Sequence, residues 1–167
     1  MTVLIAYGTT NGSTARIAEA VAAALREKGL TTETRPAADV TDVIRYEAVV
    51  VGGALYAGRW HRDARRFVRR HRHTLRRRPL WLFSSGPLDA SAAERDIPPV
   101  RAARRALTLL DARGHVTFGG CLEEGARGWV AGRILSSGKG GDFRDFAAVS
   151  AWAEQIAKEL AAERAGA

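Results

Sequence analysis

The chain has 167 residues, of which 46% are hydrophobic and 26% are charged, and its formal net charge is +8. This length and composition predict one globular domain over residues 1–167 and exclude disordered, collagen-like and membrane-spanning classes. The single cysteine, Cys121, excludes an internal disulfide framework and a cysteine-rich zinc site, and no other metal site is predicted. The first residues lack the basic and long apolar segments of a signal peptide, which predicts a cytoplasmic protein.

Strand and helix patterns alternate along the chain. Short apolar or β-branched runs predict strands at residues 3–7, 30–35, 48–51, 80–85 and 116–121. Apolar residues at helical spacing predict helices over residues 14–28, from about 62 to 75, and over 100–113 and 149–161. This alternation predicts an α/β fold in which helices cover both faces of a five-stranded parallel sheet of order 2-1-3-4-5. Ligands of such sheets bind beyond the carboxyl ends of the strands.

The first of these loops combines hydroxyl side chains and glycines at the start of a helix. After Gly8 the chain reads Thr9, Thr10, Asn11, Gly12, Ser13 and Thr14. Free backbone N–H groups and the dipole of the helix favour a phosphate there, and Asn11 and Gly12 tolerate a positive φ. The loop matches neither the P-loop nor the Gly-x-Gly-x-x-Gly pattern, and without a lysine it suits a monophosphate. The alternative is an ordinary capped helix, which would need only one such hydroxyl.

The segment from Thr9 to Thr14 resembles the FMN-phosphate loop of flavodoxins, Thr/Ser-x-Thr/Asn-Gly-x-Thr, in sequence and in position. Two further segments resemble the flavodoxin-like, menaquinone-dependent protoporphyrinogen oxidase group: residues 52–61 before a basic helix, and residues 141–146 before a tryptophan-containing last helix. The resemblance implies a flavodoxin-like three-layer sandwich, FMN as cofactor, and an oxidoreductase that acts on a small anionic substrate. In that group the segment equivalent to residues 122–144 is longer and more basic, which speaks against membrane-surface contact and quinone use here.

By the same resemblance, two loops border the isoalloxazine ring. Their candidate residues are Ala54, Leu55, Tyr56, Ala57, Gly58, Trp60, Ser84, Ser85, Gly86 and Pro87. Tyr56 or Trp60 is expected to stack on the ring, although either could instead be buried at a strand end. The Ser85 hydroxyl and nearby backbone are expected at the pyrimidine edge, whereas Ser84 could belong to a plain turn.

Because a flavin carries the chemistry itself, no catalytic side chain is required, and none is assigned. His61 lies beside the predicted ring and is a candidate for proton transfer, although a histidine at a helix start is more often an ordinary surface residue. His71 is expected to be a satisfied core histidine and His115 a structural one. Cys121 is expected to be a buried small hydrophobe at a strand end.

The positive charge is concentrated in one segment. Residues 59–78 hold ten arginines and one acid, Asp63, which leaves 16 basic and 17 acidic residues elsewhere. A buried stripe is predicted at Ala64, Phe67, Val68, His71 and Leu75, so that most of the arginines face outward. This face is either solvated or attracts an acidic redox partner protein, an anionic lipid surface or an acidic substrate. No nucleic-acid module accompanies it, and no nucleic-acid partner is expected. The positive charge of this face would favour two-electron chemistry on the flavin. The alternative to an oxidoreductase is a flavodoxin-type electron carrier that docks a protein partner through this face.

Overall fold

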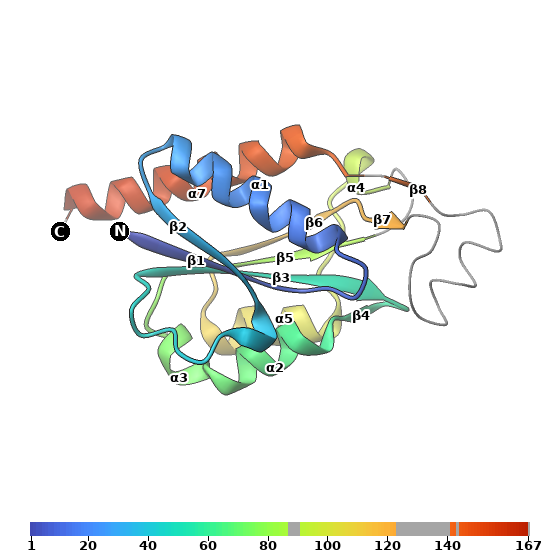
Figure 1. Ribbon diagram of the computed structural model, residues 1–167, viewed down its shortest axis with the longest axis horizontal. Coiled ribbons are helices and arrows are strands. Elements are labelled where there is room, and N and C mark those ends of the chain that lie inside the picture. The colour runs from blue at the N-terminus through green and yellow to red at the C-terminus, as the bar shows by residue number, and fades with distance from the viewer. Residues whose placement is uncertain (87–90, 123–140, 143, 167) are drawn as a thin grey trace.

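A computed structural model describes residues 1–86, 91–122, 141–142 and 144–166. Its central sheet contains five parallel strands in the order β2-β1-β3-β5-β6 (Figure 1). They are β1 (Thr2–Gly8), β2 (Thr31–Pro36), β3 (Ala48–Tyr56), β5 (Leu80–Ser85) and β6 (Gly114–Phe118). Counted among themselves, these strands have the order 2-1-3-4-5, which confirms the predicted topology. The short strand β4 (Arg59–Trp60) adds an antiparallel hairpin to the end of β3 and was not predicted.

Two layers of helices enclose the sheet, as Figure 1 shows. On one face lie α1 (Ser13–Glu27) and α7 (Phe146–Gly166), and on the other lie α2 (Arg62–Arg70), α3 (Arg72–Leu75) and α5 (Arg101–Leu110). The remaining described elements are the 3₁₀ turn η1 (Ala37–Asp39), α4 (Ser91–Glu94) and a small antiparallel pair, β7 (Cys121–Leu122) with β8 (Gly141–Asp142). No helix in the described ranges is both long and apolar enough to cross a membrane.

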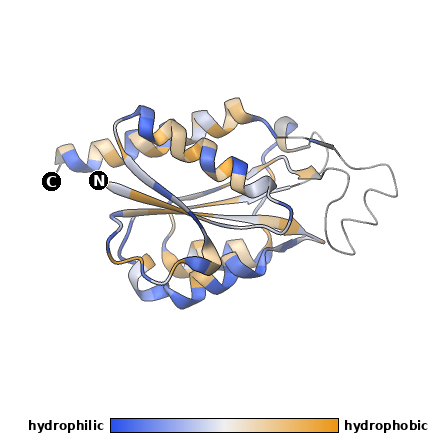
Figure 2. Cartoon of the chain, viewed as in Figure 1, coloured by the Kyte–Doolittle hydropathy of each residue, from blue (hydrophilic) through white to orange (hydrophobic). Residues whose placement is uncertain are grey.

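Alternation along the strands divides the core into two halves. In β1, Val3 and Ile5 pack under α1 and α7, whereas Leu4 and Ala6 pack against α2 and α5. The central strand β3 is buried on both faces, as a continuous apolar run in a parallel sheet requires. The apolar sides of the helices face the sheet and their hydrophilic sides face outward (Figure 2).

Several elements differ from their predicted limits. The third strand was expected to end at Gly52 and Gly53, but β3 continues to Tyr56. The reason is packing: a Cβ at Gly52 would overlap the Phe83 ring, and one at Gly53 would overlap the Trp60 indole. These glycines therefore admit large rings against the strand instead of forming a turn.

The other differences concern boundaries. Helix α5 ends at Leu110, three residues before its predicted end. The arginine-rich helix is divided at His71, whose φ of −102° and ψ of 14° separate α2 from α3. The stripe is confirmed in part: Ala64, Phe67 and Leu75 are buried, whereas Val68 and His71 are half-buried. The last long strand ends at Phe118, so Cys121 begins the separate strand β7 and is half-exposed rather than buried. The last helix begins at Phe146, three residues before its predicted start.

Candidate cofactor site

The loop between β1 and α1 lies at the carboxyl edge of the sheet, where the strand order reverses between β1 and β3. Gly12 precedes the first residue of α1 with φ 84° and ψ −9°, a left-handed conformation that a glycine adopts without strain. A glycine at the N-cap offers no side chain to the free N–H groups, and the first turn of α1 holds no acidic residue. The alternative of an ordinary side-chain-capped helix is therefore wrong.

The hydroxyl groups of the loop differ in their contacts. The Thr9 Oγ1 accepts a hydrogen bond from the Gly12 N–H at 3.1 Å, which folds the loop on itself. The Ser13 Oγ accepts from the Cys121 N–H at 3.1 Å and so joins the start of α1 to β7. The Thr14 side chain is fully buried, yet its Oγ1 has no hydrogen-bond partner among the described residues. An unmet buried hydroxyl costs about 1–3 kcal/mol, so this group is suited to bind an acceptor supplied from outside the chain.

Two contacts connect this loop to the next strand end. The Asn11 Nδ2 donates to the Tyr56 hydroxyl at 2.7 Å. The Thr10 Oγ1 lies 3.1 Å from His61 Nε2. Segments about 50 residues apart in the sequence are thereby held together at one edge of the sheet.

The hairpin of β3 and β4 forms the second part of the site. Tyr56 pairs with Arg59 across a two-residue turn in which Ala57 has φ 49° and Gly58 has φ 69°. Two consecutive positive φ values are typical of the type I′ turn, which matches the twist of the paired strands. The sequence gives only a weak signal for this turn, because alanine seldom adopts a positive φ.

The two aromatic candidates lie in different environments. The Tyr56 side chain is half-buried at the end of β3. Trp60 is 1% exposed, packs against Gly53, and donates from Nε1 to the Phe83 carbonyl oxygen at 3.2 Å. Its indole is covered by the core on the α2 side of the sheet and presents no free face for stacking. The expectation that Trp60 could stack on a ring is therefore corrected, and Tyr56 is the aromatic candidate of this hairpin.

The end of β5 forms the third part. The Ser84 hydroxyl is 2.8 Å from His115 Nε2 and is fully buried, which makes Ser84 a structural residue rather than a ligand contact. Burial lowers the pKa of His115 to about 4, so this ring is neutral at physiological pH. Ser85 is 4% exposed, and the Gly86 N–H donates to the Phe118 carbonyl oxygen at 3.0 Å. Gly86 has φ 129°, and a Cβ there would lie 3.1 Å from Leu55 Cβ. Pro87 lies outside the described residues.

His61 connects the site to the arginine-rich helix. It is the N-cap of α2, and its Nδ1 accepts from the Asp63 N–H at 3.2 Å. Burial lowers the pKa of His61; the Asp63 carboxylate opposes this effect, whereas Arg62 and Arg65 add to it. His71, between α2 and α3, is half-buried rather than a core residue, but it has a partner as predicted, since its Nε2 lies 3.3 Å from the Val40 carbonyl oxygen.

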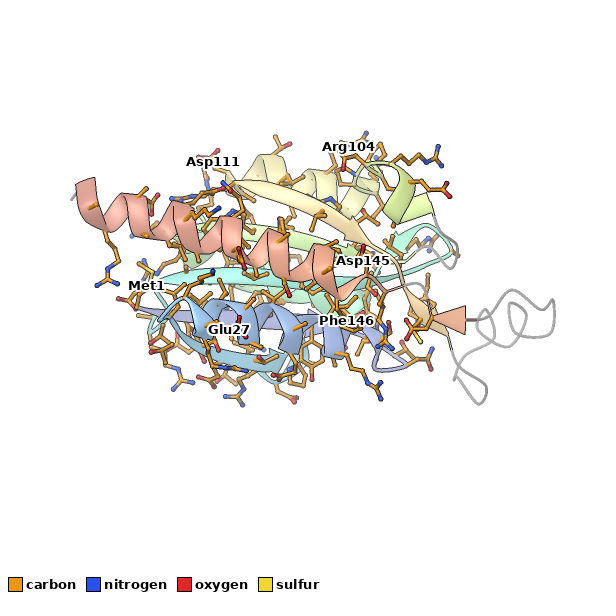
Figure 3. All side chains as sticks on the ribbon, turned by 90° about the horizontal axis from the view of Figure 1, so that it is seen from above. Met1, Glu27, Arg104, Asp111, Asp145 and Phe146 are labelled. Carbon is orange, nitrogen blue, oxygen red and sulfur yellow. The ribbon has the colours of Figure 1, made fainter. Side chains whose placement is uncertain are left out.

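The segment that resembles the last motif of the oxidase group forms a compact junction before α7. The Arg144 side chain is 4% exposed, pairs with the Asp142 carboxylate at 2.6 Å and lies 5.3 Å over the Phe146 ring centroid. The Arg144 guanidinium holds the pKa of Asp142 at about 2. Asp145 and Phe146 lie at the end of α7 nearest to β8 (Figure 3). Phe143 lies outside the described residues.

The arginines form a wider surface than the sequence pattern indicates. Helices α2 and α3 together carry six arginines against one acid, and α5, which packs beside α2, adds Arg101, Arg104 and Arg105 with no acid. We call these nine residues the arginine layer: Arg62, Arg65, Arg66, Arg69, Arg70, Arg72, Arg101, Arg104 and Arg105. All nine are exposed, and Arg104 lies at the periphery of the molecule in Figure 3.

The opposite helices carry almost no net charge. Helix α1 has two basic and two acidic residues, and α7 has two basic and three acidic ones. Within the described part of the chain, Arg62 is the one member of the arginine layer with an ion pair, to Asp63 at 3.4 Å. Arg78, which the sequence grouped with these residues, is structural instead: its Nε donates to the Tyr46 carbonyl oxygen at 2.8 Å and its Nη2 to that of Ile44 at 3.1 Å.

A doubly wound parallel sheet with a hydroxyl-rich loop at its switch point defines a flavodoxin-like protein. A family model described as "Flavodoxin domain" matches residues 4–133, and the chain belongs to this family of FMN-binding redox proteins. No curated protein matches the sequence.

Solved structures share the fold at low sequence identity. Rubredoxin:oxygen oxidoreductase from Desulfovibrio gigas matches with a TM-score of 0.66 at 14% identity, over 98% of this chain and 37% of the longer one. A flavodoxin from Pseudomonas aeruginosa matches with a TM-score of 0.63 at 16% identity, over 95% of this chain and 97% of that one. An archaeal flavodoxin gives 0.59 at 14% identity, over 96% and 99%. The chain thus spans about a third of the first of these proteins and nearly all of the other two.

The residues of the first loop fit the cofactor of the family. The buried Thr14 hydroxyl lacks an acceptor, and Gly12 leaves the N–H groups of the first turn of α1 without a side-chain cap. Both features suit an anionic phosphate without a countercharge in the loop.

Proposed function

We propose that the protein is an FMN-dependent oxidoreductase that acts on a small anionic substrate, as in the protoporphyrinogen oxidase group that its sequence resembles. The observation that supports this proposal is the position of the arginine layer. Helix α2 begins at Arg62, two residues after the end of the β3–β4 hairpin, which by resemblance borders the flavin ring. Fixed positive charge beside the site attracts anionic substrates and stabilises negative charge that develops during reduction.

The residues of the chain have distinct roles in this mechanism. FMN, when bound, supplies the two-electron chemistry, so the protein needs no nucleophile. Thr14 and the backbone of the first turn of α1 would hold the phosphate, with Thr9, Thr10, Asn11 and Ser13 shaping the loop around it. Tyr56 would flank the ring, and Ser85 and Gly86 would lie near its pyrimidine edge. The arginines of α2 would orient a carboxylated substrate, such as a carboxylated tetrapyrrole, by bidentate hydrogen bonds.

The first test is the absorption spectrum of the purified protein, with mass identification of any yellow ligand. The second is anaerobic mixing of the FMN-loaded protein with protoporphyrinogen, which should bleach the flavin band, followed by reoxidation with a quinone. A variant in which Arg65 and Arg69 are replaced by glutamine should need more substrate for half-maximal reduction. Absence of bleaching with protoporphyrinogen and with other carboxylated tetrapyrroles would refute the proposal.

A second candidate function is that of an electron carrier that docks an acidic redox partner protein through the arginine layer. The observation that favours it is the exposure of these nine arginines on α2, α3 and α5, helices whose one acidic residue is Asp63. Guanidinium groups suit the carboxylates of such a partner.

Turnover of a small substrate without a second protein distinguishes the two functions, because only the enzyme shows it. Docking should also weaken steeply with ionic strength, since it depends on opposite charges. A cytoplasmic location stays a prediction from the sequence.

A further inference from the structure

His61 occupies a point where three elements meet. It follows β4, caps α2, and lies against the end of β1, where a Cβ on Gly8 would come within 2.8 Å of its Nδ1. Its backbone N–H donates to the Ala54 carbonyl oxygen at 2.9 Å, which ties it to β3. The side chain is 10% exposed. The ring is therefore held by its surroundings rather than free in solvent.

The two ring nitrogens have different partners, and these partners determine where the proton lies. The Asp63 N–H donates to Nδ1 at 3.2 Å, so Nδ1 carries no proton. In the neutral ring the proton is then on Nε2, which lies 3.1 Å from Thr10 Oγ1. The Nε2–H donates to the Thr10 hydroxyl. The neutral form is favoured by burial and by Arg62 and Arg65, whereas Asp63 is the acidic group that faces the ring.

This contact fixes the role of the Thr10 hydroxyl. A hydroxyl has one proton to donate and two lone pairs to accept with, and one lone pair of Thr10 is engaged by His61. Its proton then points away from His61, and Thr10 itself is part of the loop that resembles the phosphate loop. A phosphate oxygen accepts hydrogen bonds from a hydroxyl group. Because the Thr10 hydroxyl accepts from His61, its own proton is directed away from His61 and can be donated to a phosphate.

We propose that His61 is a positioning residue that orients the Thr10 hydroxyl as a donor to the FMN phosphate and anchors the phosphate loop to the start of α2. This inference rests on FMN binding by that loop. It assigns His61 no proton transfer with the substrate, and it gives the residue two separable functions. Nδ1 stabilises α2, and Nε2 orients the cofactor loop.

Two conservative variants separate these functions. In His61→Asn the side-chain oxygen replaces Nδ1 as the cap of α2, but no donor reaches Thr10. In His61→Gln the longer amide places its NH2 near the position of Nε2, but the cap is lost. The readouts are thermal melting of the apoprotein and fluorescence titration with FMN and with riboflavin, which lacks the phosphate.

We expect a crossed result. His61→Asn should melt near the wild-type temperature and bind FMN about 3- to 10-fold more weakly, as for the loss of one oriented hydrogen bond. His61→Gln should bind FMN within about twofold of wild type and melt about 2–4 °C lower, as for the loss of one cap. Riboflavin affinity should be unchanged in both variants. In a Thr10→Ala background, His61→Asn should have no further effect on FMN affinity.

The failures of the two ideas are distinguishable. If the wild-type protein binds FMN no more tightly than riboflavin, phosphate recognition by this loop fails, and the inference about His61 fails with it. If the wild type prefers FMN but His61→Asn keeps that preference in full, only the inference about His61 is overturned. Additive effects of His61→Asn and Thr10→Ala on FMN affinity would also overturn it.

Discussion

Replacement of Thr14 by valine should strengthen the apoprotein and weaken the cofactor complex. The two side chains have nearly the same shape, so the change removes a buried hydroxyl without opening a cavity. That hydroxyl has no partner among the described residues and is fully buried. Removing an unmet buried hydroxyl should raise the free energy of unfolding by about 1–2 kcal/mol, which is about 3–6 °C in melting temperature for a chain of this size.

FMN binding should change in the opposite direction. A hydrogen bond to a charged acceptor contributes about 1.5–3 kcal/mol, so Thr14→Val should bind FMN about 10- to 150-fold more weakly. The assays are urea denaturation of the apoprotein and fluorescence titration with FMN, with riboflavin as the ligand that lacks the phosphate. Thr14→Ser is the matched control, because it keeps the hydroxyl and should keep FMN affinity. A Thr14→Val protein that is less stable than wild type, with unchanged FMN affinity, would refute the assignment of Thr14 to the phosphate.

Three further measurements test the packing, the titration and the charge. Gly53→Ala should cost about 1–3 kcal/mol of stability in urea denaturation, because its Cβ overlaps the Trp60 indole; Gly58→Ala, with φ 69° but open space around it, should cost only about 1 kcal/mol, and equal losses would contradict the packing argument. Stability should fall as the pH drops from about 6.5 to about 4, because His115 is neutral when folded and protonated when unfolded in that window. The loss attributable to His115 should be at most about 3 kcal/mol, and His115→Gln should flatten the profile; His61 and His71, whose pKa values are also lowered, contribute in the same direction. Reversing charge with Arg65→Glu and Arg69→Glu should lower the midpoint potential of bound FMN by tens of millivolts at low salt, on the order expected for charges about 10 Å away, whereas Lys158→Glu on α7 should change it little. If the α2 and α7 variants shift the midpoint potential equally, or not at all, the arginine layer does not determine the potential of the cofactor.

The place of the hydroxyl-rich loop before α1 was predictable because its signal is local. Six consecutive residues carry the hydroxyls, the amide and the glycine, and the position of the loop follows from the neighbouring strand and helix. The five-strand topology was predictable for a similar reason, since alternating strands and helices with right-handed crossovers leave few arrangements. Neither prediction depends on which side chains from distant segments contact one another.

The remaining features depend on contacts between distant segments. Trp60 is a core residue because Gly53 leaves space for its indole, and no periodicity in either segment indicates that fit. Arg104 and its neighbours join the arginine layer because α5 packs beside α2, although about 30 residues separate the two helices. The Ala57–Gly58 turn escaped prediction because an alanine with a positive φ is set by the paired strands and not by its own preference.

The contacts of the first loop connect it to the charged helix α2 although the loop itself holds no basic side chain. The loop carries no lysine or arginine, and two of its polar contacts join neutral groups: the Thr10 hydroxyl contacts His61, and the Asn11 amide contacts Tyr56. His61 in turn caps the first turn of α2, which connects the start of this arginine-bearing helix to the loop. Substitutions among these arginines should therefore change the potential of the cofactor and the affinity for anions while the preference for FMN over riboflavin stays the same. Substitutions of Thr14, and His61→Asn, should have the opposite effect. They should reduce the preference for FMN over riboflavin and leave the salt dependence of anion binding unaltered.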